Sequence, residues 1–413
     1  MSETHLVTGG TGFVGGALIL ELLSETDAQV LCLVRSKGGI DAAQARLQSS
    51  LATAARSYHR TDLLGEIEHR CRAVPGDILE PLCGNETVAR GTVSEVWHCA
   101  ASLQFEDENE AEIFAHNVRG TKNVLDLATH SRAPKFNYVS TAYVAGSRTG
   151  QILEELPSPE TQTNNSYEKS KIVAELTVAS EGHMHTRIFR PSIVIGHSRT
   201  LMATSFTGLY GFIRELSRFK RKVARRLGGY LAHRHLRVWA DEQVPVNLIP
   251  VDMVASSAVR ISRSNSARRI FHLTNDRPVA VEESLRILFH EEDMRAPRYV
   301  GSSAEFTSID EAFDRAIRFY RSYLSNAKVF DRTNSESVLG PSVLSGNLQG
   351  ENLLRHIRWY AAHLADTRCA ALTDDEAADL DREPMHKRFE SLPIIPLASA
   401  GDASRRYSVT LGA

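Results

Sequence analysis

Long apolar runs are absent from this sequence, and so are the signals of secretion. No run approaches the ~18–20 residues needed to span a bilayer, so no transmembrane segment is expected. No basic stretch precedes an apolar segment near the N-terminus, which argues against a signal peptide. The five cysteines form no Cys-x-x-Cys pair, and their odd number disfavours a disulfide framework. We therefore expect a cytoplasmic protein.

An excess of charge of one sign is also missing. The 48 Lys and Arg residues nearly balance 50 Asp and Glu, so the formal net charge of -2 does not indicate a nucleic-acid partner. The histidine pairs His183/His185 and His233/His235 have i,i+2 spacing, which does not place both rings on one helix face, and no metal site is predicted. What the chain does have is length: 413 residues, 42% hydrophobic, are enough for one large or two modest domains.

Strand and helix patterns alternate through the first half of the chain. Apolar strand patterns occur at 4–8, 29–34, 71–75, 93–99, 135–141 and 186–189. Helical patterns between them include 11–23, 41–70, 111–129 and 166–180. This alternation predicts an α/β fold, namely a Rossmann-like doubly wound parallel sheet with helices on both faces.

The predicted domains follow from where this alternation stops. We expect residues 1–200 to form a Rossmann domain that is completed by about 245–275. Residues 201–244 and 276–390 are expected to form a smaller, mainly helical substrate-binding region. Residues 391–413 lack clear periodicity and are expected to form a flexible tail.

A glycine-rich turn joins the first strand to the first helix. Gly9 permits the tight turn, Gly12 lets the backbone approach a phosphate, and Gly15 lets the helix pack closely on the sheet. The helix N-terminus is then available to the pyrophosphate of a dinucleotide. Thr11, Phe13 and Val14 belong to the same turn and are expected to line the site.

The end of the second strand predicts which nicotinamide cofactor binds. NAD-preferring enzymes usually place an acidic residue there, to hold the ribose 2′-hydroxyl. This sequence has Arg35, Ser36 and Lys37 instead. A guanidinium can bind a 2′-phosphate through two hydrogen bonds, whereas a carboxylate would repel it. We therefore predict NADPH; the alternative is a solvated basic turn.

Further cofactor contacts are expected after the third and fourth strands. The carboxylate of Asp77, next to Ile78, is placed to accept the adenine amino group, or alternatively to start a turn. The small residues Ala100, Ala101 and Ser102 would let the chain pass close to the cofactor. Asn117 is expected either to contact the cofactor or to act as a buried polar bridge between its helix and the neighbouring strands.

Tyr167 and Lys171 form the candidate catalytic pair. Asn164-Asn165-Ser166 is a good helix-capping run, and the i,i+4 spacing places the two side chains on one helix face. A nearby ammonium would lower the phenol pKa, and Tyr167 would protonate a carbonyl oxygen that receives hydride. Thr141, at the end of the fifth strand, would polarise that carbonyl; Ser140 is its rival, because strand side chains alternate between faces.

These motifs together resemble one protein family. They are Thr8-Gly-Gly-Thr-Gly-Phe-Val-Gly15, Leu33-Val-Arg-Ser36, Gly76-Asp-Ile-Leu-Glu-Pro81, His98-Cys-Ala-Ala-Ser102, Asn117-Val-Arg-Gly-Thr121, Val139-Ser-Thr-Ala-Tyr143, Tyr167-Glu-Lys-Ser-Lys171, Arg190-Pro-Ser-Ile-Val-Ile-Gly196 and Ile249-Pro-Val-Asp-Met253. The chain resembles the extended short-chain dehydrogenase/reductases, and within them the fatty acyl-CoA reductase and carrier-protein thioester reductase branch. The likeness is strong to about residue 275 and weaker beyond, where it rests on Val329-Phe-Asp-Arg-Thr-Asn334.

The resemblance implies a function. It implies Thr141, Tyr167 and Lys171 as the catalytic set, and contacts from Pro191, Ser192 and Ile193 to the nicotinamide. It implies an acyl-CoA or acyl-carrier-protein substrate, reduced to an aldehyde and in some cases to an alcohol, without a cysteine nucleophile. Other reactions of the superfamily, on a ketone, sterol or sugar nucleotide, stay open, as does a redox-neutral or regulatory NADP-binding role.

Residues 214–237 are strongly basic, with nine Lys or Arg residues against Glu215. Three interpretations stay open: recognition of CoA phosphates or of an acidic carrier protein, peripheral contact with an anionic membrane, or a solvated helix face. The sequence does not indicate the oligomeric state.

Overall fold

The computed structural model describes residues 3–86, 88, 91–104 and 107–369. The chain divides into two compact units, Met1–Tyr360 and Ala361–Ala413. The first unit contains every element discussed below apart from the end of the last helix. The tail expected at 391–413 lies outside the described residues.

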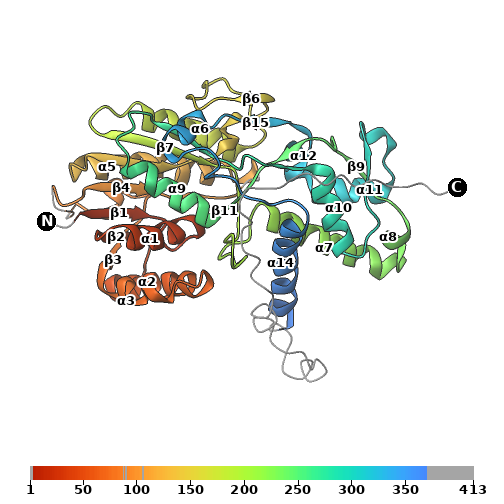
Figure 1. Cartoon of the computed structure of the whole chain (residues 1–413), viewed down its shortest axis with the longest axis horizontal. Coiled ribbons are helices and arrows are strands. Elements are labelled where there is room, and N and C mark those ends of the chain that lie inside the picture. The colour runs from red at the N-terminus through yellow and green to blue at the C-terminus, as the bar shows by residue number, and fades with distance from the viewer. Residues whose placement is uncertain (1–2, 87, 89–90, 105–106, 370–413) are drawn as a thin grey trace. The chain divides into compact units, whose positions relative to one another are not determined.

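A seven-stranded parallel sheet forms the centre of the first unit (Figure 1). The strand order is β12-β7-β5-β4-β1-β2-β3, which confirms the predicted Rossmann-like fold. The order runs outward in both directions from β1 and β4, so a crevice is expected where their carboxyl ends diverge. The strands are β1 Thr4–Thr8, β2 Gln29–Val34, β3 Cys71–Pro75, β4 Glu95–His98, β5 Lys135–Val139, β7 His185–Pro191 and β12 Ile270–Leu273.

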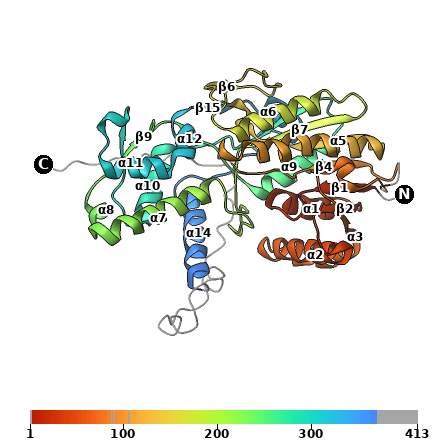
Figure 2. The same cartoon turned by 180° about the vertical axis from the view of Figure 1, so that it is seen from behind.

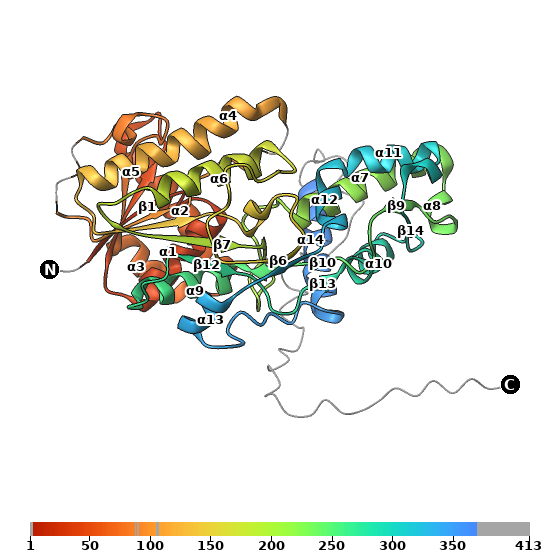
Figure 3. The ribbon, with the colours of Figure 1, turned by 90° about the horizontal axis from the view of Figure 1, so that it is seen from above.

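Helices cover both faces of this sheet, and each face has its own apolar core. Figure 3 shows α1, α2, α3 and α9 on one side and α4, α5 and α6 on the other. Leu18, Leu47 and Val254 belong to the first core, whereas Val124 and Ala174 belong to the second. The helices are α1 Phe13–Glu25, α2 Gly39–Ser57, α3 Leu64–Arg70, α4 Glu110–Phe114, α5 Gly120–His130, α6 Ser166–Ala179 and α9 Val251–Arg263.

The predicted elements agree with the observed ones except at their ends and inside two helices. The helix expected at 41–70 is divided into α2 and α3 by a non-helical stretch and a short 3-10 turn at Thr61–Leu63. The helix expected at 111–129 is interrupted by a π-helical turn at Ala115–Arg119. The strand expected at 135–141 ends at Val139, because Thr141 starts a 3-10 turn and accepts a hydrogen bond from the Tyr143 amide.

A mainly helical region follows β7, with four two-stranded ladders that the sequence did not indicate. Strands of two or three residues are too short to show an alternating pattern. Figure 2 shows α7, α8, α10, α11 and α12 gathered beside the sheet. The helices are α7 Leu209–Leu227, α8 Tyr230–His233, α10 Val281–Glu291, α11 Ser308–Ala316, α12 Arg321–Ser325, α13 Thr333–Leu339 and α14 Glu351–Cys369. The paired strands are β8 Ile193–Ile195 with β11 Leu248–Pro250, β9 Arg237–Trp239 with β14 Arg298–Val300, β10 Pro245–Val246 with β13 Val279–Ala280, and β6 Gly150–Ile152 with β15 Lys328–Phe330.

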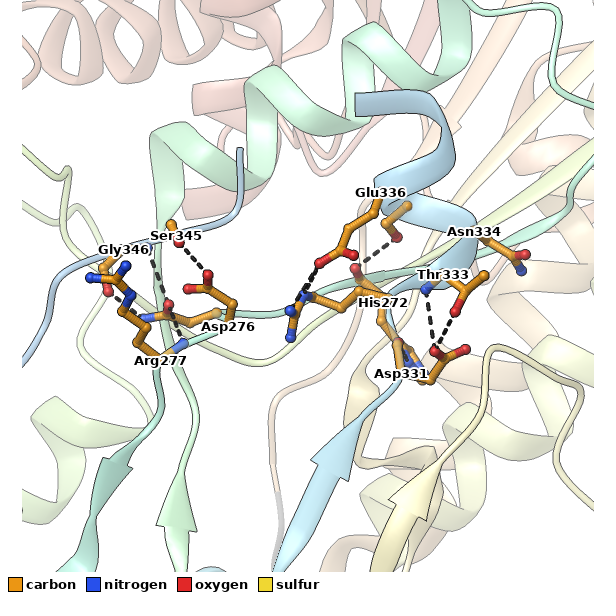
Figure 4. Close-up of polar contacts among 12 residues, drawn as sticks. His272, Asp276, Arg277, Asp331, Thr333, Asn334, Glu336, Ser345 and Gly346 are labelled. Carbon is orange, nitrogen blue, oxygen red and sulfur yellow. Dashed lines mark hydrogen bonds and ion pairs between the residues drawn. The ribbon is translucent and has the colours of Figure 1, made fainter. Parts of the chain in front are cut away.

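The segment after β15 returns to the central sheet and binds to its outermost strand (Figure 4). The Asp331 carbonyl accepts a hydrogen bond from His272 Nδ1 at 2.7 Å, and the Asn334 side chain donates to the Ile270 carbonyl at 3.0 Å. Farther along, Asn275 Nδ2 donates to the Gly346 carbonyl at 2.7 Å. The motif around residues 329–334 therefore attaches the C-terminal region to β12.

Among the described residues, none of the helices combines the length and the apolar character that crossing a bilayer requires.

Candidate active site

The glycine turn after β1 is shaped so that only glycine fits. Gly9 has φ +72°, and a Cβ on it would lie 2.7 Å from the Ala100 amide nitrogen. A Cβ on Gly15 would overlap with the Gly9 carbonyl oxygen, so α1 packs directly on the turn. Gly12 is the N-cap of α1 and supplies no capping side chain. The first amides of α1 are therefore available to an anion, as the pyrophosphate interpretation requires.

A cavity of about 580 Å³ begins at this turn and continues into the helical region. It lies at the carboxyl ends of β1, β4, β5 and β7, where a parallel sheet usually binds its ligand. Sixteen of the residues proposed from the sequence line it: Gly9, Thr11, Gly12, Phe13, Val14, Gly15, Arg35, Ile78, Ala100, Ala101, Thr141, Tyr167, Lys171, Pro191, Ser192 and Ile193.

Four of the proposed residues are not among those that line the cavity. They are Ser36, Asp77, Ser102 and Asn117. Ser36 Oγ accepts a hydrogen bond from the Gly38 amide, and Asp77 Oδ1 accepts one from the Leu79 amide, so each shapes a turn. Asn117 is buried and joins three segments: its side chain binds both backbone groups of Ser102 and donates to Ser170 Oγ on α6 at 2.9 Å. Asn117 thus makes the contacts of a polar bridge.

A second arginine, which the sequence did not indicate, accompanies Arg35. Arg46 of α2 also lines the cavity, and its Nη1 donates to the Arg35 carbonyl at 2.9 Å. Both side chains are exposed. Two guanidinium groups at the end of β2 form a strongly cationic environment, suited to a phosphate. The only sequence signal for Arg46 was its position in the helix that follows β2, and the direction of that helix was unknown.

Tyr167 and Lys171 lie on α6 and face the cavity together. Asn165 caps this helix by accepting a hydrogen bond from the Glu168 amide at 2.9 Å, so the predicted capping run is confirmed. Tyr167 is 8% exposed and Lys171 is 1% exposed. Lys171 Nζ donates to the Val139 carbonyl at 2.9 Å and lies 4.2 Å from the centre of the Tyr138 ring. The end of β5 therefore holds the Lys171 amino group in place.

Burial dominates the protonation of this pair. It lowers the pKa of Lys171 to about 7, although the nearby Glu175 carboxylate opposes the shift. Burial also raises the pKa of Tyr167, and Glu168 raises it further. The expectation that Lys171 lowers the phenol pKa is thus outweighed in this structure, because desolvation disfavours both charged forms. Tyr167 is held as a neutral phenol, which is the form that donates a proton.

Thr141 and Ser140 both line the cavity, so the expected alternation does not choose between them. The reason is that β5 ends at Val139, before either residue. Thr141 Oγ1 accepts a hydrogen bond from the Tyr143 amide at 3.2 Å, which leaves its hydroxyl hydrogen free to donate. Ser140 Oγ is buried and has no hydrogen-bond partner among the described residues. Both hydroxyls stay candidates for polarising a carbonyl.

Beyond these side chains the cavity becomes apolar. Its far part is lined by the first turn of α7, by α10 and by the segment from Phe319 to Leu324. Phe212, Leu285 and Leu288 are among the side chains there. None of these residues was named from the sequence, because they come from three separate segments of the region after residue 200.

Comparison with known proteins gives a consistent result. The model of an NAD-binding family described as Male sterility protein matches residues 7–258. One polypeptide of the linear gramicidin synthase of Brevibacillus parabrevis is 30% identical over 210 residues, which are 48% of this chain and 4% of that protein. Fatty acyl-CoA reductase wat of Drosophila melanogaster is 29% identical over 239 residues, 50% of this chain and 45% of that protein. The chain therefore spans less than half the length of either relative.

A solved structure covers most of the chain. It is the terminal R domain from the myxalamid PKS-NRPS biosynthetic pathway, with a TM-score of 0.70 and 25% identity. The alignment covers 88% of this chain and 91% of that domain. The likeness thus extends past the sheet into the helical region that lines the far part of the cavity.

Proposed function

The chain belongs to the NAD-binding family described as Male sterility protein, within the extended short-chain dehydrogenase/reductases, and from this premise we propose that it is an NADPH-dependent oxidoreductase that reduces an acyl thioester to an aldehyde. One observation carries the proposal: a single cavity joins the glycine turn to Thr141, Tyr167 and Lys171 and then continues as an apolar pocket.

The cavity fits a phosphorylated dinucleotide. Glycine at 9 and 15 permits the close backbone packing of the turn, and α1 presents uncapped amides to the pyrophosphate. Arg35 and Arg46, which both line the cavity, would bind the 2′-phosphate. Pro191, Ser192 and Ile193 would border the nicotinamide, and Lys171 would hydrogen-bond its ribose.

The chain's own side chains would handle the proton and the carbonyl. Bound NADPH supplies a hydride to the thioester carbonyl carbon. Thr141 donates a hydrogen bond to the carbonyl oxygen, and Tyr167 gives that oxygen its phenolic proton, which yields a hemithioacetal. The C–S bond then breaks: sulfur leaves with the bonding electron pair and gains a proton, while the hydroxyl loses its proton and becomes the aldehyde carbonyl. In the overall reaction, a thioester, NADPH and one proton would give an aldehyde, a thiol and NADP⁺.

A carrier protein is the favoured source of the thioester. The matched relatives include a peptide synthase and the R domain of a biosynthetic pathway, although this chain spans only a small part of the synthase. Helix α7 lines the cavity with Leu209 and Phe212 and exposes Lys222, Arg225 and Arg226 in its second half. At 1.5 Å per residue these charges begin about 15 Å beyond Phe212 along the helix axis. An acidic partner bound there would have its thioester arm directed along α7 toward Tyr167. A cytoplasmic location would suit such a reaction.

The test is consumption of NADPH together with release of free thiol. Purified protein is given acyl groups of the same length on CoA and on an acidic carrier protein, at low and at high salt. We expect thiol release in step with NADPH loss, and a carrier reaction that weakens as salt rises. NADPH binding without consumption of any thioester would refute the proposed reaction, and equal rates on CoA and carrier, unaffected by salt, would refute the carrier assignment.

A further inference from the structure

Aromatic side chains form a continuous row along the far part of the cavity. Tyr143 contacts Tyr323 (ring centres 4.6 Å apart), Tyr323 contacts Phe319 (5.6 Å), Phe319 contacts Tyr320 (4.9 Å), and Tyr320 contacts Phe212 of α7 (5.3 Å). All five line the cavity, and we call them the aromatic row. The row begins at the residue whose amide binds Thr141 Oγ1 and ends at the first turn of α7.

The surfaces around the aromatic row are also apolar. Leu285 and Leu288, on one face of α10, and Leu324 line the same part of the cavity. An acyl group attached to a carbonyl at Thr141 and Tyr167 would therefore lie against hydrocarbon. Each methylene buried this way strengthens binding by about fourfold, as long as the pocket has room for it. The depth of the pocket then decides up to which acyl chain length each added methylene still increases the affinity.

Gly211 lies directly against Tyr320, which lines the cavity. It lies in the first turn of α7, and a Cβ placed on it would overlap with the Tyr320 hydroxyl oxygen. The Tyr320 ring carbon Cζ would be 3.6 Å from that Cβ, an ordinary contact. The Phe212 ring meets Tyr320 edge-on and the Phe319 ring packs on it as well. A Tyr320 side chain displaced by a larger residue at 211 is therefore expected to move into the cavity.

We propose that Gly211 and Tyr320 set the depth of the acyl pocket, and that the substrate is a thioester of an apolar acyl chain long enough to reach Tyr320. This inference rests on the proposed thioester reduction. It assigns chain-length selection to a contact between α7 and the segment before α12, both outside the dinucleotide part of the cavity.

The experiment compares a long and a short acyl chain in Gly211→Ala. The substrates are dodecanoyl and butanoyl thioesters of one carrier, and the measured quantity is the ratio of their kcat/KM values. We expect this ratio to fall at least tenfold, because the long chain loses several methylene contacts while the short chain does not reach Tyr320. Gly65→Ala, in α3 with open space around the glycine, is the control and should leave the ratio unchanged.

A second substitution separates pocket depth from general damage. Tyr320→Phe removes the one atom that the new methyl group would overlap, so Gly211→Ala/Tyr320→Phe should regain most of the wild-type ratio. If Gly211→Ala does not fold, Tyr320→Ala alone still tests the idea, because it deepens the pocket and should raise the ratio. An unchanged ratio in Gly211→Ala, or a fall that Tyr320→Phe does not reverse, would overturn the proposal.

A binding measurement keeps this result distinct from the proposed reaction. Dodecyl and butyl thioethers of pantetheine cannot be reduced, and calorimetry gives their affinities without any turnover. If no thioester is reduced but Gly211→Ala still weakens the dodecyl thioether selectively, the reaction is wrong and the pocket assignment holds. If turnover occurs and neither ratio responds to Gly211→Ala, the reaction holds and the pocket assignment is wrong.

Discussion

Glu175→Gln is the most informative single substitution outside the cavity. Glu175 lies one helical turn after Lys171 on α6, and its carboxylate binds Arg190 of β7 through two hydrogen bonds of 2.9 and 2.6 Å. Both side chains are 0% exposed. Arg190 directly precedes Pro191, which lines the cavity. The pair thus ties the helix that carries Tyr167 and Lys171 to the strand whose last residue, Pro191, lines the cavity.

The expected cost follows from what surrounds Arg190. Its other partners are the Glu155 carbonyl and His272 Nε2. His272 Nδ1 faces the Asp331 carbonyl and must donate to it, and burial lowers the His272 pKa to about 3, so this ring is neutral. No other carboxylate is within ion-pair distance of Arg190 among the described residues. Leaving a buried charge without its partner costs about 3–5 kcal/mol, a large share of a typical stability of about 5–15 kcal/mol.

Thermal unfolding is the assay. At about 2–4 °C per kcal/mol, the loss corresponds to a fall in Tm of roughly 6–20 °C, toward the lower end for a unit of this size. Glu66→Gln is the control: Glu66 pairs with Arg70 at 3.1 Å but is 48% exposed, so its loss should cost under about 1 kcal/mol. The double variant Glu175→Leu/Arg190→Met should recover most of the stability, because neither charge is then buried. A Tm of Glu175→Gln equal to that of Glu66→Gln would refute this reasoning.

The remaining predictions concern the cavity itself. Tyr167→Phe should lower kcat by about 10²–10⁴-fold with little change in the Kd for NADPH, since only the proton donor is lost; intact turnover would remove Tyr167 from its role. Arg35→Asp or Arg46→Asp should reduce the preference for NADPH over NADH by roughly 10–100-fold in Kd, because a charged hydrogen bond is replaced by repulsion, whereas Arg56→Asp, exposed on the same helix but outside the cavity lining, should not. The pKa of Lys171 is near 7, so the ammonium is present below that pH and kcat should fall as pH rises through it. Because Glu175 raises that pKa, Glu175→Gln should shift the fall in kcat to lower pH. A flat kcat from about one pH unit below the pKa to about two units above it would contradict this assignment.

The sequence predicted those features of the fold and of the candidate site that depend on residues close together in the chain. The glycine turn, the alternation of strands and helices, and the Tyr167/Lys171 spacing are set by neighbouring residues, and all of them appear in the structure as expected. Arg46 and the aromatic row were missed, because their positions depend on how distant helices are oriented. The direction of the Tyr167 pKa shift was also missed, since it depends on burial, which no motif reports.

The same distinction applies within single elements. The helix pattern at 111–129 was correct in extent but did not indicate the π-helical turn there, which contains Asn117; the partners of this side chain are 15 and 53 positions away. The choice between Ser140 and Thr141 depended on where β5 ends. The strand was expected to reach residue 141, but it ends at Val139, so strand alternation does not apply to either residue. Errors of that size are ordinary for element ends, and here they fell where the chemistry is proposed.

The contacts of Glu154 determine where this chain can be cut when it is fused to another protein. Its carboxylate accepts hydrogen bonds from the His272 amide and the Ser335 hydroxyl, and it also binds the Asn334 amide. The family match ends at residue 258, far before Ser335. A gene fusion cut at that boundary would remove His272, Asn334 and Ser335, so the Glu154 carboxylate would lose these partners and Arg190 would lose its contact with His272. Hybrid synthetases that borrow this chain should therefore place their junction after α13.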